Sequence, residues 1–338
     1  MCERELESMY EAESFMKVKL WGVRGSLPSP VAPEVLRHRL EEALAQFGRL
    51  KDSQVPITAA QFVDTLPIHL SGGYGGNTTC AEVNAGGTRL LIDAGSGLRP
   101  FADWVMHTEP ACPEYHMYFT HFHWDHLIGL PFFPPMYIKG KTIHVYGCHP
   151  DLEAALRTLF QKPFFPVPYE VIRPQVKYHL LEPYKRQRIG EIELTPYKLD
   201  HPDPCWGARI EHGGKSLAWA VDTECNRLTR EEIGADLGLY QKADLLVFDA
   251  QYSFLEGLEK INWGHSSGPI GIDLALREEV KQALFVHHDP AAPDEAVQQA
   301  EEQTRHYYQE LVRSHKRAGL PTPELNWRFA REGETVEL

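Results

Sequence analysis

The sequence lacks the apolar segments by which proteins enter or cross membranes. Its first ten residues are polar and acidic, without the basic and apolar stretches of a secretory signal. No apolar run approaches the roughly 20 residues that a membrane span needs. The six cysteines include no Cys-x-x-Cys pair, and scattered thiols of this kind are typical of a reducing compartment. We therefore expect a cytoplasmic protein without a membrane anchor.

The sequence is also poor in positive charge. Lys and Arg number 34 against 47 Asp and Glu, so the formal net charge is −13. A surface of this sign repels a long polyanion, and we do not expect long nucleic acid as a partner. A small phosphodiester is not excluded, because divalent ions dominate the electric field inside a pocket.

The remaining composition is that of a globular protein. Of the 338 residues, 43% are hydrophobic and 24% are charged, without internal repeats or low-complexity tracts. The chain is long enough to bury a sizeable core. We expect an N-terminal extension over residues 1–15 and a single domain over 16–338, with an insertion near 31–70. Within the insertion, residues 33–48 have the pattern of an amphipathic helix.

Alternating polarity predicts many strands, with helices between them. The expected strands lie near 16–23, 79–84, 88–93, 115–120, 142–147, 175–181, 191–199, 207–212 and 216–221, followed by an apolar run at 244–248. The expected helices lie near 98–107, 150–161, 228–234, 267–280 and 292–318, with a short helix after residue 126.

One hexapeptide stands out, His121-Phe-His123-Trp-Asp125-His126. Imidazole nitrogens and carboxylate oxygens are the ligands that zinc and neighbouring transition metals accept. Alternate residues of an extended segment point to one side, so His121 and His123 can share one ion while Asp125 and His126 face a second. A His-rich surface loop or a tag is the alternative, but tags are terminal and this run lies between the apolar segments 115–119 and 127–133.

The hexapeptide and the residues before it, Met117-Tyr-Phe-Thr, resemble the His-x-His-x-Asp-His signature of metallo-β-lactamase-fold hydrolases. The resemblance implies an α/β protein, the αββα four-layer sandwich of that fold. It also implies an enzyme with two divalent metal ions. Zn²⁺ is the expected metal, with Mn²⁺ or Fe²⁺ as alternatives.

The resemblance further assigns roles to residues beyond the hexapeptide. His201 would complete the first ion's ligands, and Asp222, after an apolar strand, would bridge both ions, which would compensate for its burial. The last ligand would be His287 or His288; we expect His287, because His288 would point to the other side of an extended segment. Asp93 would orient a ligand histidine without binding metal. The expected metal ligands are His121, His123, Asp125, His126, His201, Asp222 and His287.

Other motifs resemble the phosphodiesterase branch, which includes tRNA 3′-processing endonucleases and small cyclic-phosphate phosphodiesterases. These are the glycine-rich segment 21–28, the Gly-Gly-Asn-Thr-Thr segment 75–79, Asp249 in Phe-Asp-Ala, and His265 in Trp-Gly-His-Ser-Ser. In that branch the histidine protonates the leaving alkoxide and the acid holds its tautomer. The alternative is that the segment around His265 only caps a helix. Asp125, His265 and Asp249 are the expected catalytic residues.

We therefore expect a dinuclear-metal-dependent phosphodiesterase that cleaves a small or cyclic nucleotide-type phosphodiester through a metal-bridging hydroxide. The long Gly/Pro-rich basic arm of the tRNA-processing enzymes is missing, which argues against tRNA as substrate. A tRNA 3′-processing-type endonuclease, a lactonase or thioesterase, a redox iron enzyme and a non-catalytic relative remain alternatives. A homodimer is compatible with the sequence. The Pro/Phe-rich stretches 130–137 and 162–169 are interpreted as a lid or as plain packing.

Overall fold

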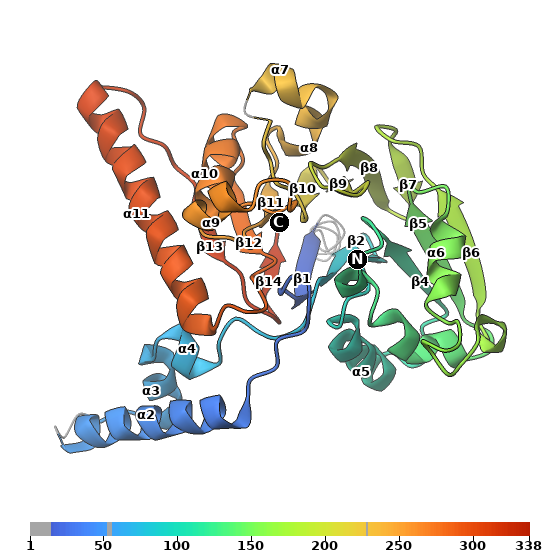
Figure 1. Ribbon diagram of the computed structural model, residues 1–338, viewed down its shortest axis with the longest axis horizontal. Coiled ribbons are helices and arrows are strands. Elements are labelled where there is room, and N and C mark those ends of the chain that lie inside the picture. The colour runs from blue at the N-terminus through green and yellow to red at the C-terminus, as the bar shows by residue number, and fades with distance from the viewer. Residues whose placement is uncertain (1–14, 53–55, 228) are drawn as a thin grey trace, which may run out of the picture.

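The computed structural model describes residues 15–52, 56–227 and 229–338, so that all but the last residue of the predicted extension 1–15 lies outside the described part. Its centre consists of two seven-stranded sheets (Figure 1). The first sheet has the order β14 (Thr335–Glu337), β1 (Met16–Gly22), β2 (Cys80–Ala85), β3 (Thr88–Ile92), β4 (Glu114–Tyr118), β5 (Thr142–Gly147), β6 (Gln175–Leu180). The second has the order β13 (Asn326–Phe329), β12 (Gln282–Val286), β11 (Leu245–Asp249), β10 (Lys215–Ala220), β9 (Trp206–His212), β8 (Ile192–Lys198), β7 (Gln187–Ile189).

Each sheet contains one parallel and one antiparallel half. Strands β3 to β6 are parallel to one another, and so are β10 to β13. Parallel strands are covered on both faces, which accounts for the continuous apolar run of β11, buried along its whole length. Their carboxyl ends share one edge of each sheet, and the loops after those ends carry the predicted site residues.

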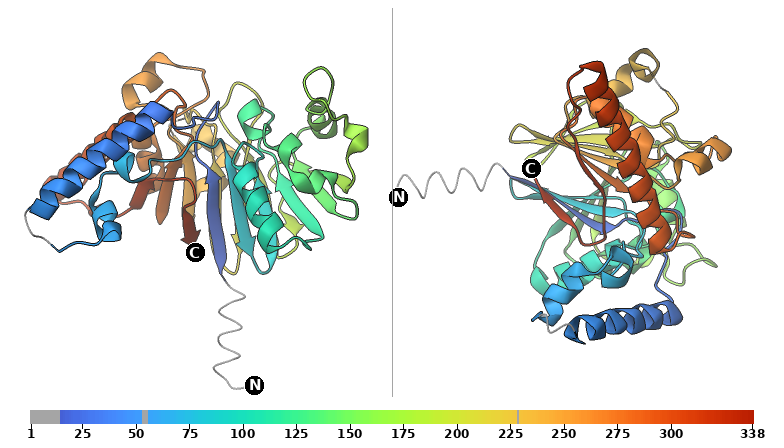
Figure 2. Two further views of the ribbon diagram at one scale, coloured as in Figure 1. Left: turned by 90° about the horizontal axis from the view of Figure 1, so that it is seen from below. Right: turned by 90° about the vertical axis from the view of Figure 1, so that its left-hand side faces the viewer.

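Helices cover the outer face of each sheet (Figure 2). Along β10, Leu217 and Trp219 enter the core between the sheets, whereas Ala218 and Ala220 enter the core beneath the outer helices. This alternation follows from the two-residue period of a strand. Helices α5 (Leu98–Thr108) and α6 (Leu152–Thr158) pack on the first sheet, and α7 (Arg230–Ile233), α8 (Leu237–Tyr240), α10 (Gly268–Arg277) and α11 (Asp294–Ala318) pack on the second. The predicted αββα sandwich is confirmed.

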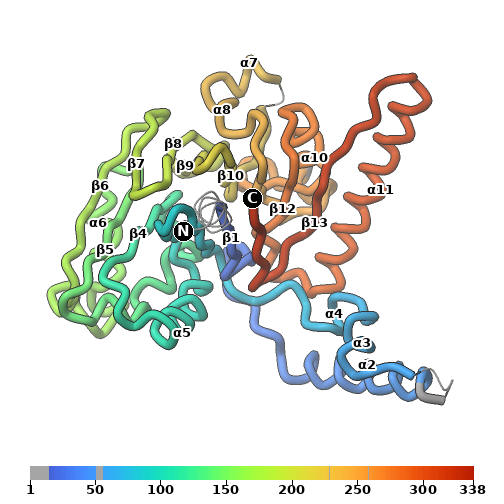
Figure 3. Tube along the Cα trace, turned by 180° about the vertical axis from the view of Figure 1, so that it is seen from behind, coloured from blue at the N-terminus to red at the C-terminus, as the bar shows by residue number. Residues whose placement is uncertain are grey.

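The region of the predicted insertion forms three helices that lie beside the sandwich (Figure 3): α2 (Pro33–Asp52), α3 (Ala59–Thr65) and α4 (Ile68–Ser71). A buried ion cluster ties α2 to the body. Both Arg24, in the loop after β1, and Arg39, on α2, donate to the carboxylate of Asp294, at 2.8 and 2.7 Å. The buried Asp294 is thereby compensated by two cations.

Several predicted boundaries and elements differ from the structure. Helix α2 runs to Asp52 instead of 48, and a 3₁₀ turn already begins inside the hexapeptide, at Trp124–His126. The proline-rich stretches contain the 3₁₀ turns Leu130–Phe132, Pro134–Tyr137 and Tyr169–Val171. Strands β7, β13 and β14 and the helices α3, α4, α8 and α9 (Phe254–Glu259) were not predicted, because short elements carry little periodicity.

No helix among the described residues is long and apolar enough to span a lipid bilayer. The assignment of residues 16–338 to a single domain stays a prediction.

Candidate active site

The predicted site residues lie at the carboxyl ends of strands from both sheets. Asp93 directly follows β3, and His121 comes three residues after the end of β4. From the second sheet, Asp222 follows β10, Asp249 ends β11 and His287 directly follows β12. The carboxyl ends of the parallel strands of both sheets therefore lie at one edge of the sandwich, and the polar site residues gather there.

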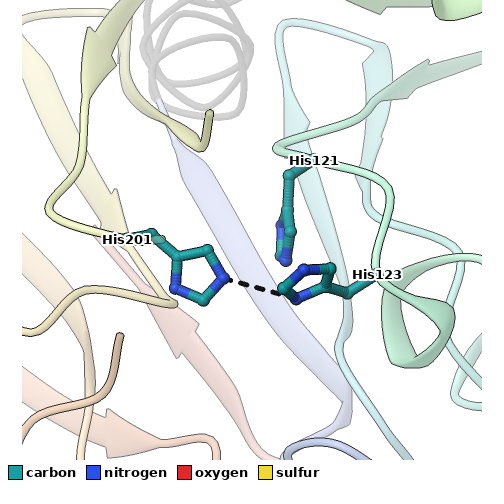
Figure 4. Close-up of side chains that lie close together, drawn as sticks. All are labelled: His121, His123 and His201. Atoms are coloured by element: carbon teal, nitrogen blue, oxygen red, sulfur yellow. Dashed lines mark hydrogen bonds between the residues drawn. The ribbon is translucent and has the colours of Figure 1, made fainter. Parts of the chain in front are cut away.

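The first cluster consists of three histidines (Figure 4). His121, His123 and His201 each present a ring nitrogen, and these three nitrogens lie within 4.8 Å of one another. Nε2 of His201 is 3.3 Å from Nδ1 of His123. His201 reaches the other two from a separate loop, after β8. Three converging imidazoles form a set of donors suited to one Zn²⁺-like ion.

The second cluster is fully buried and carries two carboxylates. Asp125, His126, Asp222 and His287 offer ligand atoms that all lie within 4.8 Å of one another. Nε2 of His126 is 2.9 Å from Oδ2 of Asp222, and Nε2 of His287 is 3.1 Å from Oδ2 of Asp125. Two carboxylates at this depth are costly unless cations compensate them.

Unpartnered buried atoms test whether these residues suit a metal. Nε2 of His121 is buried without a hydrogen-bond partner, and Nε2 of His126 and Oδ2 of Asp222, although 2.9 Å apart, lack the geometry of a hydrogen bond with each other and have no other partner. Buried polar atoms are normally hydrogen-bonded, so each such atom calls for an explanation. A coordinated ion explains all three, because a ring nitrogen and a carboxylate oxygen are its ordinary ligands.

The pKa values of the second cluster also suit a metal site. Burial raises the pKa of Asp222, but the facing His287 and His126 outweigh it and leave the pKa well below the ordinary value. Burial lowers the pKa of His287, yet Asp222 and Asp125 raise it to about 10. In the metal-free protein, protons on the imidazoles thus supply the positive charge that the carboxylates need. Metal binding would replace these protons.

Three strand-end residues of the site have left-handed backbone conformations. The φ angles are 60° at Asp93, 64° at Asp222 and 65° at His287. Positive φ is uncommon for residues other than glycine, and strain of this kind gathers at functional sites. Each residue turns the chain sharply where its strand ends, which aims the side chain into the cluster.

Asp93 occupies the supporting position that was expected of it. Its Oδ2 lies 2.8 Å from Nδ1 of His126, and its Oδ1 accepts from the backbone N–H of Thr120 at 2.9 Å. If Nδ1 of His126 donates this bond, Nε2 is free to face the cluster. The contact therefore suits Asp93 to orienting the His126 ring.

Asp249 and His265 form a pair beside the second cluster. Nδ1 of His265 lies 2.9 Å from Oδ2 of Asp249, and the His265 ring lies 5.0 Å from that of His287, centroid to centroid. The backbone N–H groups of Gln251 and Ser266 donate to Oδ1 of Asp249. Burial raises the pKa of Asp249, but the contacts with His265 and His287 outweigh it and keep the group ionised.

The two adjacent histidines after β12 point in different directions. His287 faces Asp125 and Asp222, whereas Nε2 of His288 lies 3.0 Å from the carbonyl oxygen of Ala330 and its ring stacks on Phe329. Burial lowers the pKa of His288 to about 3, so it is neutral. The geometry thus favours His287 as the candidate ligand.

Three contacts of the site were not predicted. Nε2 of His123 lies 2.8 Å from Oδ2 of Asp203, and Nδ1 of His201 lies 3.1 Å from the carbonyl oxygen of Gly264. The backbone N–H of Ser26 donates to Oδ2 of Asp125 at 2.8 Å. Only Asp203 left a trace in the sequence, as an acid two residues after His201.

A known protein family matches the part of the chain that carries most of these residues. The family model described as "Beta-lactamase superfamily domain" matches residues 88–288, more than half of the chain. No curated protein sequence matches significantly.

Similar folds occur among solved structures. The metallo-beta-lactamase fold protein YhfI from Bacillus subtilis has a TM-score of 0.61 at 15% identity, covering 96% of this chain and 100% of that one. A diphosphatase from the PhnP family has a TM-score of 0.57 at 16% identity, covering 96% and 97%. The short form of human tRNase Z has a TM-score of 0.53 at 14% identity, covering 95% and 98%.

Identities this low show a shared fold. The family match goes further, because it contains the hexapeptide, His201, Asp222 and His287. The chain therefore belongs to the beta-lactamase superfamily, as its motifs predicted, and it is a hydrolase of the metallo-β-lactamase fold.

Proposed function

We propose that this protein is a dinuclear-metal-dependent phosphodiesterase that acts on a small or cyclic nucleotide-type phosphodiester. The observation that carries the proposal is the Asp249–His265 pair, whose imidazole lies against both candidate metal clusters. The His265 ring is 5.7 Å from that of His201 and 5.0 Å from that of His287, centroid to centroid. A group that can deliver a proton at this place suits a reaction with an alkoxide leaving group.

We assign the two clusters to two divalent ions, with Zn²⁺ as the expected metal. His121, His123 and His201 would hold one ion, and Asp125, His126 and His287 the other, with Asp222 between them. Bound ions would supply an activated water and neutralise negative charge on the phosphodiester. Asp93 keeps His126 in position for this role.

The protein's own contribution to bond cleavage is a proton at Nε2 of His265. Asp249 accepts a hydrogen bond from Nδ1–H of His265, which leaves Nε2–H to face the leaving oxygen. As water forms a new bond to phosphorus and the P–O bond to the leaving oxygen breaks, that proton passes to the departing oxygen, which is released as an alcohol instead of an alkoxide. General acid catalysis of this kind contributes about 10² to 10⁴ in rate.

Two considerations favour a small substrate. The net charge of −13 opposes the approach of a long polyanion. The fold is shared with a diphosphatase as well as with a tRNase Z, so it does not itself demand RNA. The five described cysteines have free thiols, in keeping with the cytoplasmic location that we also propose.

The experiment is a comparison of substrates on the Zn²⁺- or Mn²⁺-loaded protein. We expect turnover of bis(4-nitrophenyl) phosphate and of cyclic nucleotides, no processing of precursor tRNA, and no turnover of an acyl-lactone. An Asp222→Ala variant should lose the activity, which would exclude a contaminating enzyme. Circular dichroism checks that the variant is folded. Turnover of the lactone alone would replace the proposal with a lactonase or thioesterase, and tRNA cleavage alone with a processing endonuclease.

A further inference from the structure

The tryptophans divide sharply by exposure. The chain has seven. Trp21 and Trp219 are buried, and three more are half-buried: Trp104, Trp206 and Trp327. Trp124 and Trp263 are 73% and 63% exposed. Trp124 lies between His123 and Asp125, and Trp263 is two residues before His265, so both exposed tryptophans belong to segments that carry candidate site residues.

The chain neighbours of the two tryptophans contact different edges of the His201 ring. The Nε2 edge of that imidazole faces His123, the neighbour of Trp124. Its Nδ1 edge faces the carbonyl oxygen of Gly264, the neighbour of Trp263. Nδ1 and Nε2 lie on different edges of the ring, so the segments that carry the two tryptophans meet His201 from different edges.

Both tryptophans have fixed backbones. The carbonyl oxygen of Trp124 accepts from the N–H groups of Leu127 and Ile128, at 3.0 and 2.8 Å. The loop that carries Trp263 is held through Asn262, whose N–H donates to both carboxylate oxygens of Glu224, at 2.9 and 3.1 Å. The indoles are thus presented on anchored segments, as stacking surfaces need to be.

We propose that Trp124 and Trp263 are stacking platforms for the nucleobase of the substrate. This inference rests on the proposed function and adds the residues that select a nucleotide over other small phosphodiesters. A flat aromatic ring is the ligand that an exposed indole beside a phosphodiester site suits best. Base stacking on aromatic side chains tolerates every base, so we expect selection for a base without strong discrimination among bases.

The kinetic test uses two esters that share the 4-nitrophenolate leaving group. Thymidine 5′-(4-nitrophenyl phosphate) carries a base, and methyl 4-nitrophenyl phosphate does not. Trp124→Ala and Trp263→Ala should each lower kcat/KM for the thymidine ester by about 5- to 150-fold, mainly through KM, and leave the methyl ester nearly unchanged. The Trp→Phe variants should recover much of the loss. Leu44→Ala, which removes an exposed side chain of α2, is the control.

A binding measurement separates this inference from the proposed function. Adenosine 5′-monophosphate should quench the tryptophan fluorescence of the protein, and the double Ala variant should lose the quench. A quench without hydrolysis of either ester would retain the stacking platforms and refute the phosphodiesterase. An unchanged fluorescence, or equal losses on both esters in the Ala variants, would overturn the stacking role even if both esters are hydrolysed.

Discussion

Nδ1 of His265 lies 2.9 Å from Oδ2 of Asp249, and the same carboxylate oxygen lies 3.2 Å from the backbone N–H of Asp222. One buried acid therefore connects the candidate proton donor with the candidate bridging ligand. Since burial and hydrogen bonds hold Asp249 in place, the position of the His265 ring is set by the same strand ends that set the metal ligands.

The leaving group should decide how much His265 matters. The His265→Ala variant should lower kcat for a cyclic nucleotide by about 10² to 10⁴, because its leaving group is an alkoxide of the ribose. It should lower kcat for bis(4-nitrophenyl) phosphate far less, because 4-nitrophenolate leaves without a proton. Steady-state kinetics on both substrates measure the difference, with metal content checked by mass spectrometry. Equal losses on both substrates would contradict a proton-donating role.

Asp249 should act only through His265. Asp249→Asn keeps the shape of the side chain but removes the charge that holds Nδ1–H, so kcat for the cyclic nucleotide should fall. The double variant with His265→Ala should be no slower than His265→Ala alone, because residues that act as a unit are not additive. A double-mutant cycle on kcat measures this coupling. Fully additive losses would show that Asp249 has a separate role, such as binding metal.

Asp93 should control metal affinity without binding metal. Asp93→Asn weakens the hold on Nδ1 of His126, and loss of such a supporting carboxylate typically costs 10- to 100-fold in metal affinity. Competition with a zinc-chelating dye measures the dissociation constants. Asp103→Asn, at an exposed carboxylate on α5, is the matched control and should change nothing. An unchanged affinity in Asp93→Asn would refute the supporting role.

Acid should weaken the sandwich through a stack of three histidines outside the candidate metal clusters. His116, His144 and His179, on β4, β5 and β6, stack with centroids 4.8 and 5.2 Å apart. Burial lowers the pKa of all three; Lys177 adds to this at His144 and His179, whereas Glu114 opposes it at His116 and His144.

Because the folded state has the lower pKa, the unfolded chain binds protons more readily below the ordinary value of 6.5. The contribution of the stack to the free energy of unfolding should therefore fall as the pH drops through about 6.5, whereas His287, with its raised pKa, contributes with the opposite sign. His144→Gln should flatten this dependence. Urea denaturation at pH 7.5, 6.5 and 5.5 provides the comparison. The prediction fails if the variant and the parent protein lose stability in parallel.

The sequence predicts the candidate ligand residues better than the contacts that hold them in place. The hexapeptide needs only its own spacing, and the strand ends at Asp93, Asp222 and His287 are marked by apolar runs before each residue. The contact of His123 with Asp203 depends on how two loops meet, which no local pattern encodes. The same holds for β14, which pairs with β1 from the opposite end of the chain. The left-handed turn at His287 also has no glycine or asparagine to announce it.

The candidate ligands come from both sheets, His121 to His126 from the loop after β4 and His201, Asp222 and His287 from the second sheet. Ions held in this way would add a link between two sheets that are already joined by apolar contacts and by hydrogen bonds, such as the one from the N–H of Trp206 to the carbonyl oxygen of Thr120. Retention of the ions would then depend on the contact between the two sheets. Release of the ions while the secondary structure is intact would be the sign that this contact has loosened.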